Sequence, residues 1–378
     1  MTVSDPHSHT LALLRRRCAM VAPCAGGGGK RRRALLLLVS ATVALLLFYA
    51  FYPTSQDLTH VFYPTADPDQ LSDLYYSWET HTPHGLPAPP RYPVWIQATP
   101  LPPITPDRTI FLLETSGRSE IRPREWCAVE SAARAHPGYT VLFLTATARV
   151  RRTALAAAVL AFNNTRLAQL DFAEVFEGTL LEEWYRSRAV LRSWWQASHM
   201  SDALRFALLT KYGGIYLDTD VIVRRSMADM DDGAGLESEH SVAAGVLKFA
   251  RRSALPGLFA ARFVEQYDPS DWGANGPGVV TAVLLRRCGL GGLPLPPSHC
   301  GDFTIFGSRR FYGVPWPEWR LLLTPAQRDT VLERVDASYV VHTWGLHISG
   351  HSAPRGSALY QLAEQHCPLA LAASGSRF

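Results

Sequence analysis

Two aspartates one residue apart, Asp218 and Asp220, end an apolar run in the stretch KYGGIYLDTDVIVRR, residues 211–225. Isolated anions are costly to remove from water, so two carboxylates at the end of a buried strand favour a bound cation. Carboxylate oxygens are the hard ligands that Mg2+ and Mn2+ prefer, and these ions keep open positions for phosphate oxygens. The pair therefore predicts a divalent metal site for a phosphate-bearing ligand.

Two other interpretations of this pair are open. An Asp-Thr-Asp sequence can be a solvated turn, although a turn needs neither the apolar strand nor the two glycines before it. Haloacid-dehalogenase-type phosphatases also carry a strand ending in D-x-D, but there the motif usually opens the domain. Here the pair lies well inside the chain, and the acidic cluster at residues 229–232 follows too closely to come from another strand.

The residues before the pair predict the elements that position it. Ser201 is a suitable N-cap for a helix over residues 201–212, and Asp202 suits the first turn. The glycines at 213–214 stop this helix where a left-handed conformation is needed, and the strand 215–218 follows at once. Both carboxylates are thus expected at the carboxyl end of a strand, where open α/β sheets bind ligands.

Strands and helices alternate before this segment. Short apolar runs predict strands, and segments with one apolar face predict helices; the strands are 109–115, 139–145 and 167–172, and the helices 125–136 and 151–162. This alternation predicts an α/β fold with a largely parallel sheet and helices on both faces.

An apolar run without a charged residue, 34–52, follows a basic cluster. As a helix it spans about 28 Å, close to the hydrocarbon thickness of a bilayer. A cleaved signal peptide is the alternative, but its apolar core is usually shorter and small residues follow it. We expect one uncleaved transmembrane signal-anchor at 34–52, a cytoplasmic tail at 1–33, and the remainder in the secretory lumen.

The luminal part divides by composition. Residues 53–106 are rich in Pro, Thr, His and Tyr and predict an extended stem, which leaves 107–378 as the luminal catalytic domain. The formal charge of +4 comes from the tail, because the residues after position 33 sum to −2. Nucleic-acid binding is therefore not expected.

A sequon and four cysteines agree with a luminal body. Asn163 begins the sequon NNT. An even number of cysteines in an oxidising compartment predicts two disulfides, with three pairings possible, among Cys127, Cys288, Cys300 and Cys367. None of the four has the C-x2-C spacing of zinc ligands.

Several blocks together resemble a known family. The segment DALRFALLTKYGGIYLDTDVIV is similar to the DXD segment of glycosyltransferases with the GT-A fold. More narrowly, it resembles the α-1,4-galactosyltransferases that make globotriaosylceramide and the related α-1,4-N-acetylglucosaminyltransferases. Familial blocks follow in order over about residues 109–368: FLLETSGR, CAVESAARAHP, WYRSR, WGANGPGVVT, RFYGVPWPEW, ASYVVHTW and QHCP.

The resemblance implies roles for particular residues. In such enzymes Mn2+ lies between the DXD carboxylates and the diphosphate of a UDP-sugar, with Asp220 as the direct ligand. Asp218 contacts the ribose or reaches the metal through water. His342 is the candidate third metal ligand. The alternative interpretation is that His342 is a hydrogen-bonded histidine of the protein core. Asp202 and Arg205 are expected to hold the hydroxyls of the donor sugar, and their alternative is a simple ion pair within the helix.

The resemblance also points to a substrate loop at residues 273–278. Asn275 and Gly276 are its expected substrate contacts, although relatives often carry a polar residue where this chain has Ala274. Gly345 likewise stands where an asparagine is more usual. One or two of five tryptophans are expected to stack on sugar faces, among Trp194, Trp195, Trp316, Trp319 and Trp344, with Trp344 the named candidate.

The implied protein is a type II membrane protein of the Golgi. It transfers a hexose, galactose or N-acetylgalactosamine, from a UDP-sugar to a terminal galactose or N-acetylgalactosamine of a glycosphingolipid such as lactosylceramide, in α-1,4 linkage with retention. The alternatives are an α-1,4-N-acetylglucosaminyltransferase acting on protein O-glycans and a catalytically silent, lectin-like protein of the same fold.

Overall fold

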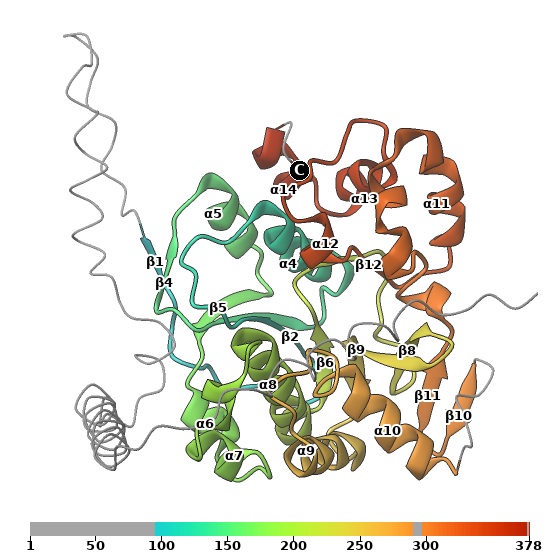
Figure 1. The fold of residues 1–378 in the computed structure, drawn as a ribbon. Coiled ribbons are helices and arrows are strands. Elements are labelled where there is room, and N and C mark those ends of the chain that lie inside the picture. The colour runs from blue at the N-terminus through green and yellow to red at the C-terminus, as the bar shows by residue number, and fades with distance from the viewer. Residues whose placement is uncertain (1–94, 290–296, 376–377) are drawn as a thin grey trace, which may run out of the picture. The chain divides into compact units, whose positions relative to one another are not determined.

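A mixed β-sheet forms the centre of the computed structural model, which describes residues 95–289, 297–375 and 378 (Figure 1). Within these residues the sheet has eight strands in the order β10-β11-β8-β9-β6-β2-β3-β5. Their bounds are β10 (Ser298–Cys300), β11 (Phe303–Phe306), β8 (Gly233–Ser238), β9 (Ser241–Phe249), β6 (Gly214–Leu217), β2 (Thr109–Glu114), β3 (Thr140–Thr145) and β5 (Thr165–Gln169).

The α/β class is confirmed, and the sheet is mixed: six of these eight strands run in one direction, whereas β9 and β10 run in the other. The pairs β3/β5, β2/β3 and β2/β6 are parallel, whereas β9 runs antiparallel to both β6 and β8. A short turn joins β8 to β9, and such a turn connects only antiparallel strands, because a parallel pair needs a crossover. The antiparallel strand β9 therefore lies directly beside β6, the strand that the two aspartates follow.

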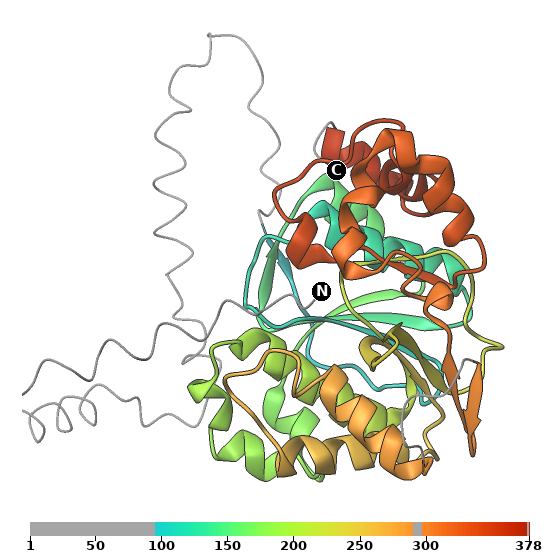
Figure 2. The same ribbon diagram turned by 45° about the vertical axis from the view of Figure 1, so that its right-hand side comes forward.

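Helices cover both faces of the sheet, as expected (Figures 1 and 2). One face carries α4 (Pro123–Ala135), α5 (Ala154–Leu160), α11 (Arg328–Arg334), α12 (Gly345–Ile348), α13 (Ala358–His366) and α14 (Pro368–Ser374). The other carries α6 (Phe172–Phe176), α7 (Glu182–Arg186), α8 (Gln196–Tyr212), α9 (Leu255–Glu265) and α10 (Pro277–Arg287). Short 3-10 helices connect these elements, at η2 (Ala189–Arg192), η3 (Ser308–Arg310), η4 (Trp316–Leu323) and η5 (Pro325–Gln327).

Helix α8 begins earlier than the sequence predicted. It starts at Gln196, so Ser201 lies inside the helix rather than at its N-cap. The hydroxyl of Ser201 does not cap the helix. It lies 3.0 Å from the hydroxyl of Tyr216 and hydrogen-bonds with it. The end of the helix is as predicted: Gly213 and Gly214 have φ angles of 64° and 89°. A Cβ on Gly214 would lie 2.4 Å from the Thr109 carbonyl oxygen, so β6 pairs with β2 only because this residue has no side chain.

One strand lies before residue 107, the predicted start of the catalytic domain. Strand β1 (Trp95–Gln97) pairs antiparallel with β4 (Arg149–Arg151). The boundary between stem and catalytic domain stays a prediction. The third predicted strand ends at Gln169 rather than 172, because the Asp171 side chain accepts a hydrogen bond from the Glu174 N–H and caps α6.

The predicted tail, membrane span and most of the stem lie outside the described residues. Among the residues that are described, no helix has both the length and the apolar character needed to cross a membrane.

Two disulfides select one of the three pairings. Cys127 of α4 is bonded to Cys367, and Cys288 to Cys300. The first closes a separation of 240 residues and ties the C-terminal helices to the sheet, and the second closes 12 residues beside β10.

A buried histidine is expected to make the fold sensitive to acid. His136 is 1% exposed; its Nε2 accepts from the Met227 N–H at 2.8 Å, and its Nδ1 lies 3.1 Å from the Ala132 carbonyl oxygen. Burial lowers the pKa of His136 to about 4. Below the unfolded pKa near 6.5, only the unfolded chain takes up this proton, so stability falls as the pH falls from about 6.5 to about 4.

Between pH 7 and pH 5 we expect His136 to account for a loss of about 2 kcal/mol in the free energy of unfolding. Denaturant titrations of the detergent-solubilised chain and of His136→Gln at both pH values measure this difference. Equal pH dependence in the two proteins would contradict the assignment.

Candidate active site

A cavity of about 630 Å3 lies at the carboxyl ends of β2 and β6. The two aspartates at the end of β6 face it, as the sequence predicted. Its polar lining includes Glu114, Arg118, Arg122, Asp202, Arg205, Asp218, Asp220, Glu237, Tyr312 and His342, and its aromatic lining Trp195, Trp272, Trp316 and Trp344.

Three residues of this cavity form a group that can hold a metal ion. One ligand atom each from Asp218, Asp220 and His342 lie within 4.8 Å of one another, and no other such group occurs within the described ranges. His342 Nε2 lies 3.2 Å from Asp220 Oδ1 and 3.7 Å from Asp218 Oδ2. His342 comes from β12 (Val340–His342), which pairs with β7 (Val221–Val223) so that His342 lies opposite Val221.

The two carboxylates of this group attract positive charge. Burial acts to lower the pKa of His342, but Asp220 and Asp218 outweigh it and raise that pKa to about 10. Two carboxylates and one imidazole are a donor set that suits Mn2+. The residues present therefore fit the divalent ion that the sequence predicts.

A buried arginine links the aspartates of α8 and β6. Arg205 lies 3.0 Å from Asp202 and 3.3 Å from Asp218, and it donates to the Ala244 carbonyl at 2.8 Å. Burial raises the pKa of Asp202 to about 6, against the effect of Arg205. Burial acts to raise the pKa of Asp218, but Arg205, His342 and Tyr216 together outweigh it and hold that pKa well below its usual range. Asp218 is thus kept ionised. The guanidinium N–H groups of Arg205 make their contacts with protein groups.

Three glycines leave room for three carboxylates. A Cβ on Gly245 would lie 2.5 Å from Asp218 Oδ2, one on Gly345 2.7 Å from Asp220 Cβ, and one on Gly276 2.5 Å from Asp202 Oδ1. The backbone N–H of Gly345 also donates to Asp220 Oδ2 at 2.7 Å. A backbone amide therefore binds the Asp220 carboxylate.

We expect Gly245→Ala to lower the transfer rate about a hundredfold, because the new methyl group displaces Asp218 from His342. Gly257→Ala is the matched control, since a Cβ there meets nothing within 4 Å. Initial rates and melting temperatures of both variants measure the effect. A Gly245→Ala enzyme with normal rate and normal manganese dependence would contradict this geometry.

The substrate loop differs from its prediction. Asn275 is fully buried; its amide donates to the Asp268 carbonyl at 2.6 Å and accepts from the Asp268 N–H at 3.0 Å. The same amide lies 3.1 Å from His199 Nε2. Asn275 therefore holds the loop rather than contacting the cavity, because a buried amide must satisfy its donors and acceptor inside the protein. Gly276 packs against Asp202 and is likewise not part of the cavity lining.

The tryptophans divide into buried and exposed groups. Trp319 and Trp344 are 7% and 8% exposed, and Trp344 packs on His342 with ring centroids 4.4 Å apart. Trp195 and Trp316 line the cavity and are partly exposed, whereas the largely exposed Trp194 does not line it. Trp272, which the sequence analysis did not single out, also lines the cavity.

Several other cavity residues were missed. Tyr216 donates to Asp218 Oδ1 at 2.6 Å, and Glu114, the last residue of β2, accepts from the Gly117 N–H at 3.0 Å. Both had a signal in the sequence: Tyr216 lies two residues before Asp218 on the same strand face, and Glu114 is an acid at the end of an apolar strand. Nothing in the sequence marked Glu237 or Tyr312 as a cavity residue. Strand β8, which carries Glu237, and the loop that carries Tyr312 are not evident from the sequence.

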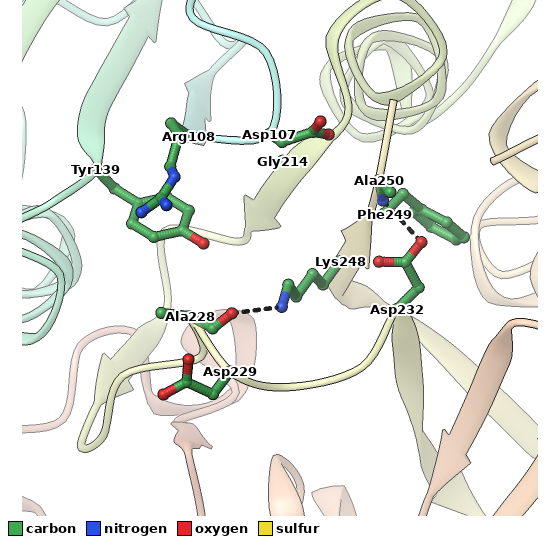
Figure 3. A pocket seen from close by; sticks show the side chains of 10 residues that line it. All are labelled: Asp107, Arg108, Tyr139, Gly214, Ala228, Asp229, Asp232, Lys248, Phe249 and Ala250. Carbon is green, nitrogen blue, oxygen red and sulfur yellow. Dashed lines mark hydrogen bonds between the residues drawn. The ribbon is translucent and has the colours of Figure 1, made fainter. Parts of the chain in front are cut away.

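A smaller cavity of about 300 Å3 lies at the amino ends of the parallel strands (Figure 3). Its charged groups hold the surrounding loops: Lys248 donates to the Ala228 carbonyl at 2.9 Å, and Asp232 accepts from the Ala250 N–H at 2.7 Å. The metal-binding group belongs to the larger cavity, which is therefore the candidate active site.

Asn163 is exposed in the turn between α5 and β5. An exposed asparagine side chain is open to attachment of a glycan, so the glycosylation site stays a prediction.

Comparison with known proteins gives two family matches. Residues 248–374 match the alpha 1,4-glycosyltransferase conserved region, and residues 123–238 match the glycosyltransferase sugar-binding region containing the DXD motif. The chain is 33% identical to the lactosylceramide 4-alpha-galactosyltransferase of Mus musculus over 71% of this chain and 76% of the relative. It is 31% identical to the alpha-1,4-N-acetylglucosaminyltransferase of Homo sapiens over 69% of this chain and 79% of the relative.

Among solved structures, the galactosyltransferase LgtC in complex with donor and acceptor sugar analogs is similar with a TM-score of 0.36 and 17% identity. The match covers 69% of this chain and 95% of that one.

Proposed function

The chain belongs to the α-1,4-glycosyltransferase family, and from this premise we propose that it transfers galactose or N-acetylgalactosamine from a UDP-sugar to a glycosphingolipid. The acceptor is a terminal galactose or N-acetylgalactosamine, as in lactosylceramide, and the product is an α-1,4 linkage. The observation that carries the proposal is the group of Asp218, Asp220 and His342 at the carboxyl end of β6. The sheet is of the GT-A type in this proposal.

The described side chains prepare this site for a nucleoside diphosphate. Asp218, Asp220 and His342 would hold Mn2+, which neutralises the negative charge of the departing UDP when bound. Arg205 and Tyr216 fix the Asp218 carboxylate, and the Gly345 N–H fixes that of Asp220. Asp202 lines the cavity beside Arg205 and is placed to accept hydrogen bonds from donor-sugar hydroxyls.

Retention follows from displacement on the front face. The bond between the anomeric carbon and the UDP oxygen breaks as the acceptor hydroxyl forms its bond on the same face. The hydroxyl proton passes to the phosphate oxygen of the leaving UDP, so no covalent enzyme intermediate is required.

We place the chain in the Golgi membrane, anchored by residues 34–52 with the catalytic body in the lumen. The apolar length of that segment and the two disulfides support this placement. N-acetylglucosamine transfer to protein O-glycans is the second candidate, and the 31% identical relative named for N-acetylglucosamine transfer favours it.

Transfer assays of the full-length chain in detergent, with manganese present, test the proposal. The donors are UDP-galactose, UDP-N-acetylgalactosamine and UDP-N-acetylglucosamine, and each is paired with lactosylceramide or with an O-glycan acceptor. We expect transfer to lactosylceramide from one of the first two donors. Transfer only to the O-glycan supports the second candidate, and no transfer or hydrolysis of any donor supports a silent, lectin-like protein.

A further inference from the structure

One buried hydroxyl in the active-site cavity lacks a partner. Tyr312 is 2% exposed and lines the cavity, yet its hydroxyl makes no hydrogen bond with any residue that the structure describes. Its ring packs against His342 and Trp344 at centroid distances of 5.4 and 5.8 Å, which fixes the phenol beside the metal-binding group. A buried hydroxyl without a hydrogen bond costs free energy, so a ligand that forms a hydrogen bond with the Tyr312 hydroxyl would bind favourably.

A carboxylate also lines this cavity. Glu237 lies near the end of β8 and is half-buried, and its carboxylate forms no hydrogen bond within the described ranges. The register between β8 and β9 shifts between Ala234 and Leu236 and again between Leu236 and Ser238, which is where Glu237 lies, and irregularities of this kind redirect a side chain. Glu237 and His342 both line the cavity, and burial raises the pKa of Glu237.

The indole ring of Trp316 also lines the cavity, and one of its faces is held in place by packing. Trp316 is 48% exposed, and its ring is stacked on His347 with centroids 5.6 Å apart and an interplanar angle of 17°. His347 is stacked in turn on the buried Trp319 at 6.4 Å. The free face of Trp316 therefore has little freedom to move, and such faces bind the apolar side of a sugar ring.

We propose that Glu237, Tyr312 and Trp316 form the subsite for the terminal sugar of the acceptor. The Glu237 carboxylate accepts hydrogen bonds from sugar hydroxyls, the Tyr312 hydroxyl pairs with another, and the indole of Trp316 stacks on the ring. This subsite deepens the proposed function and rests on it.

The charges and the exposure favour the acceptor over the donor. An unpaired carboxylate repels a diphosphate, so the group beside Glu237 must be uncharged. The donor sugar ends its molecule and can be enclosed, whereas the acceptor sugar continues into a chain that leaves the cavity. Trp316, half exposed, suits a ligand that extends outward.

Kinetics of Glu237→Gln, Tyr312→Phe and Trp316→Ala test the subsite in the full-length chain with lactosylceramide, or with the acceptor that the donor panel identifies. We expect the acceptor KM to rise about tenfold or more, while the donor KM and acceptor-independent UDP-sugar hydrolysis stay within about twofold. Trp316→Phe should recover part of the loss. Glu239→Gln, an exposed glutamate two residues along the same hairpin, is the matched control.

Tyr312→Phe also separates this role from a structural one. Because the hydroxyl has no protein partner, its removal should leave the melting temperature unchanged or higher while the acceptor KM rises. A lower melting temperature with an unchanged KM overturns the role of Tyr312. Parallel losses in donor hydrolysis assign these residues to the donor, and unchanged acceptor KM in all three variants refutes the subsite. A wild-type chain that neither transfers nor hydrolyses refutes the proposed function itself.

Discussion

Replacing Asp220 by asparagine is expected to lower the transfer rate about a thousandfold while the protein stays folded. Asp220 supplies a carboxylate to the only metal-binding group among the described residues, and it is held there by the Gly345 N–H. Asparagine keeps the size of the side chain but removes the charge that binds the cation. Steady-state rates at saturating UDP-sugar and manganese, with melting temperatures, measure the effect.

Asp231→Asn is the control, because this aspartate is exposed and lies outside the cavity. It should retain full activity. A folded Asp220→Asn enzyme that keeps more than about a tenth of the wild-type rate would exclude a direct role for this carboxylate.

Loss of the Cys127–Cys367 disulfide is expected to lower the free energy of unfolding by about 5 kcal/mol. The bond closes a separation of 240 residues and holds the C-terminal helices against α4. A cross-link over so long a segment strongly restricts the unfolded chain. Denaturant titration of Cys127→Ala/Cys367→Ala in detergent, against wild type, measures the loss.

Cys288→Ala/Cys300→Ala provides the comparison, because that bond closes only 12 residues. The same dependence on loop length predicts that losing this shorter disulfide lowers the free energy of unfolding by about 3 kcal/mol. An equal or larger effect at the short bond would show that strain or local packing, rather than chain restriction, sets the stability of these variants.

The part of the fold that the sequence predicts is the part with local signals. Continuous apolar runs mark β2 and β3, and two glycines mark the end of α8, so the position of Asp218 after β6 is readable from neighbouring residues. The antiparallel pairing of β9 with β6 and β8 has no such signal. The small residues of β8 and β9 suit several structures, and only pairing across the sheet makes them strands.

The candidate site shows the same division. His342 was found by resemblance, and the register between β7 and β12 brings it to Asp220 over a long stretch of sequence. Asn275 was predicted at the substrate by family resemblance, whereas its side chain is buried in contacts with Asp268 and His199. Glu237 depends on an irregular strand, which sequence periodicity does not reveal.

The affinity of the full-length chain for UDP, with manganese and with a chelator, tests the central claim most directly. If Asp218, Asp220 and His342 hold a cation that binds the diphosphate, the chelator should weaken UDP binding about a hundredfold, or ~3 kcal/mol by titration calorimetry. In Asp220→Asn, manganese should have little effect. Equal affinity for UDP in the two conditions would contradict the account.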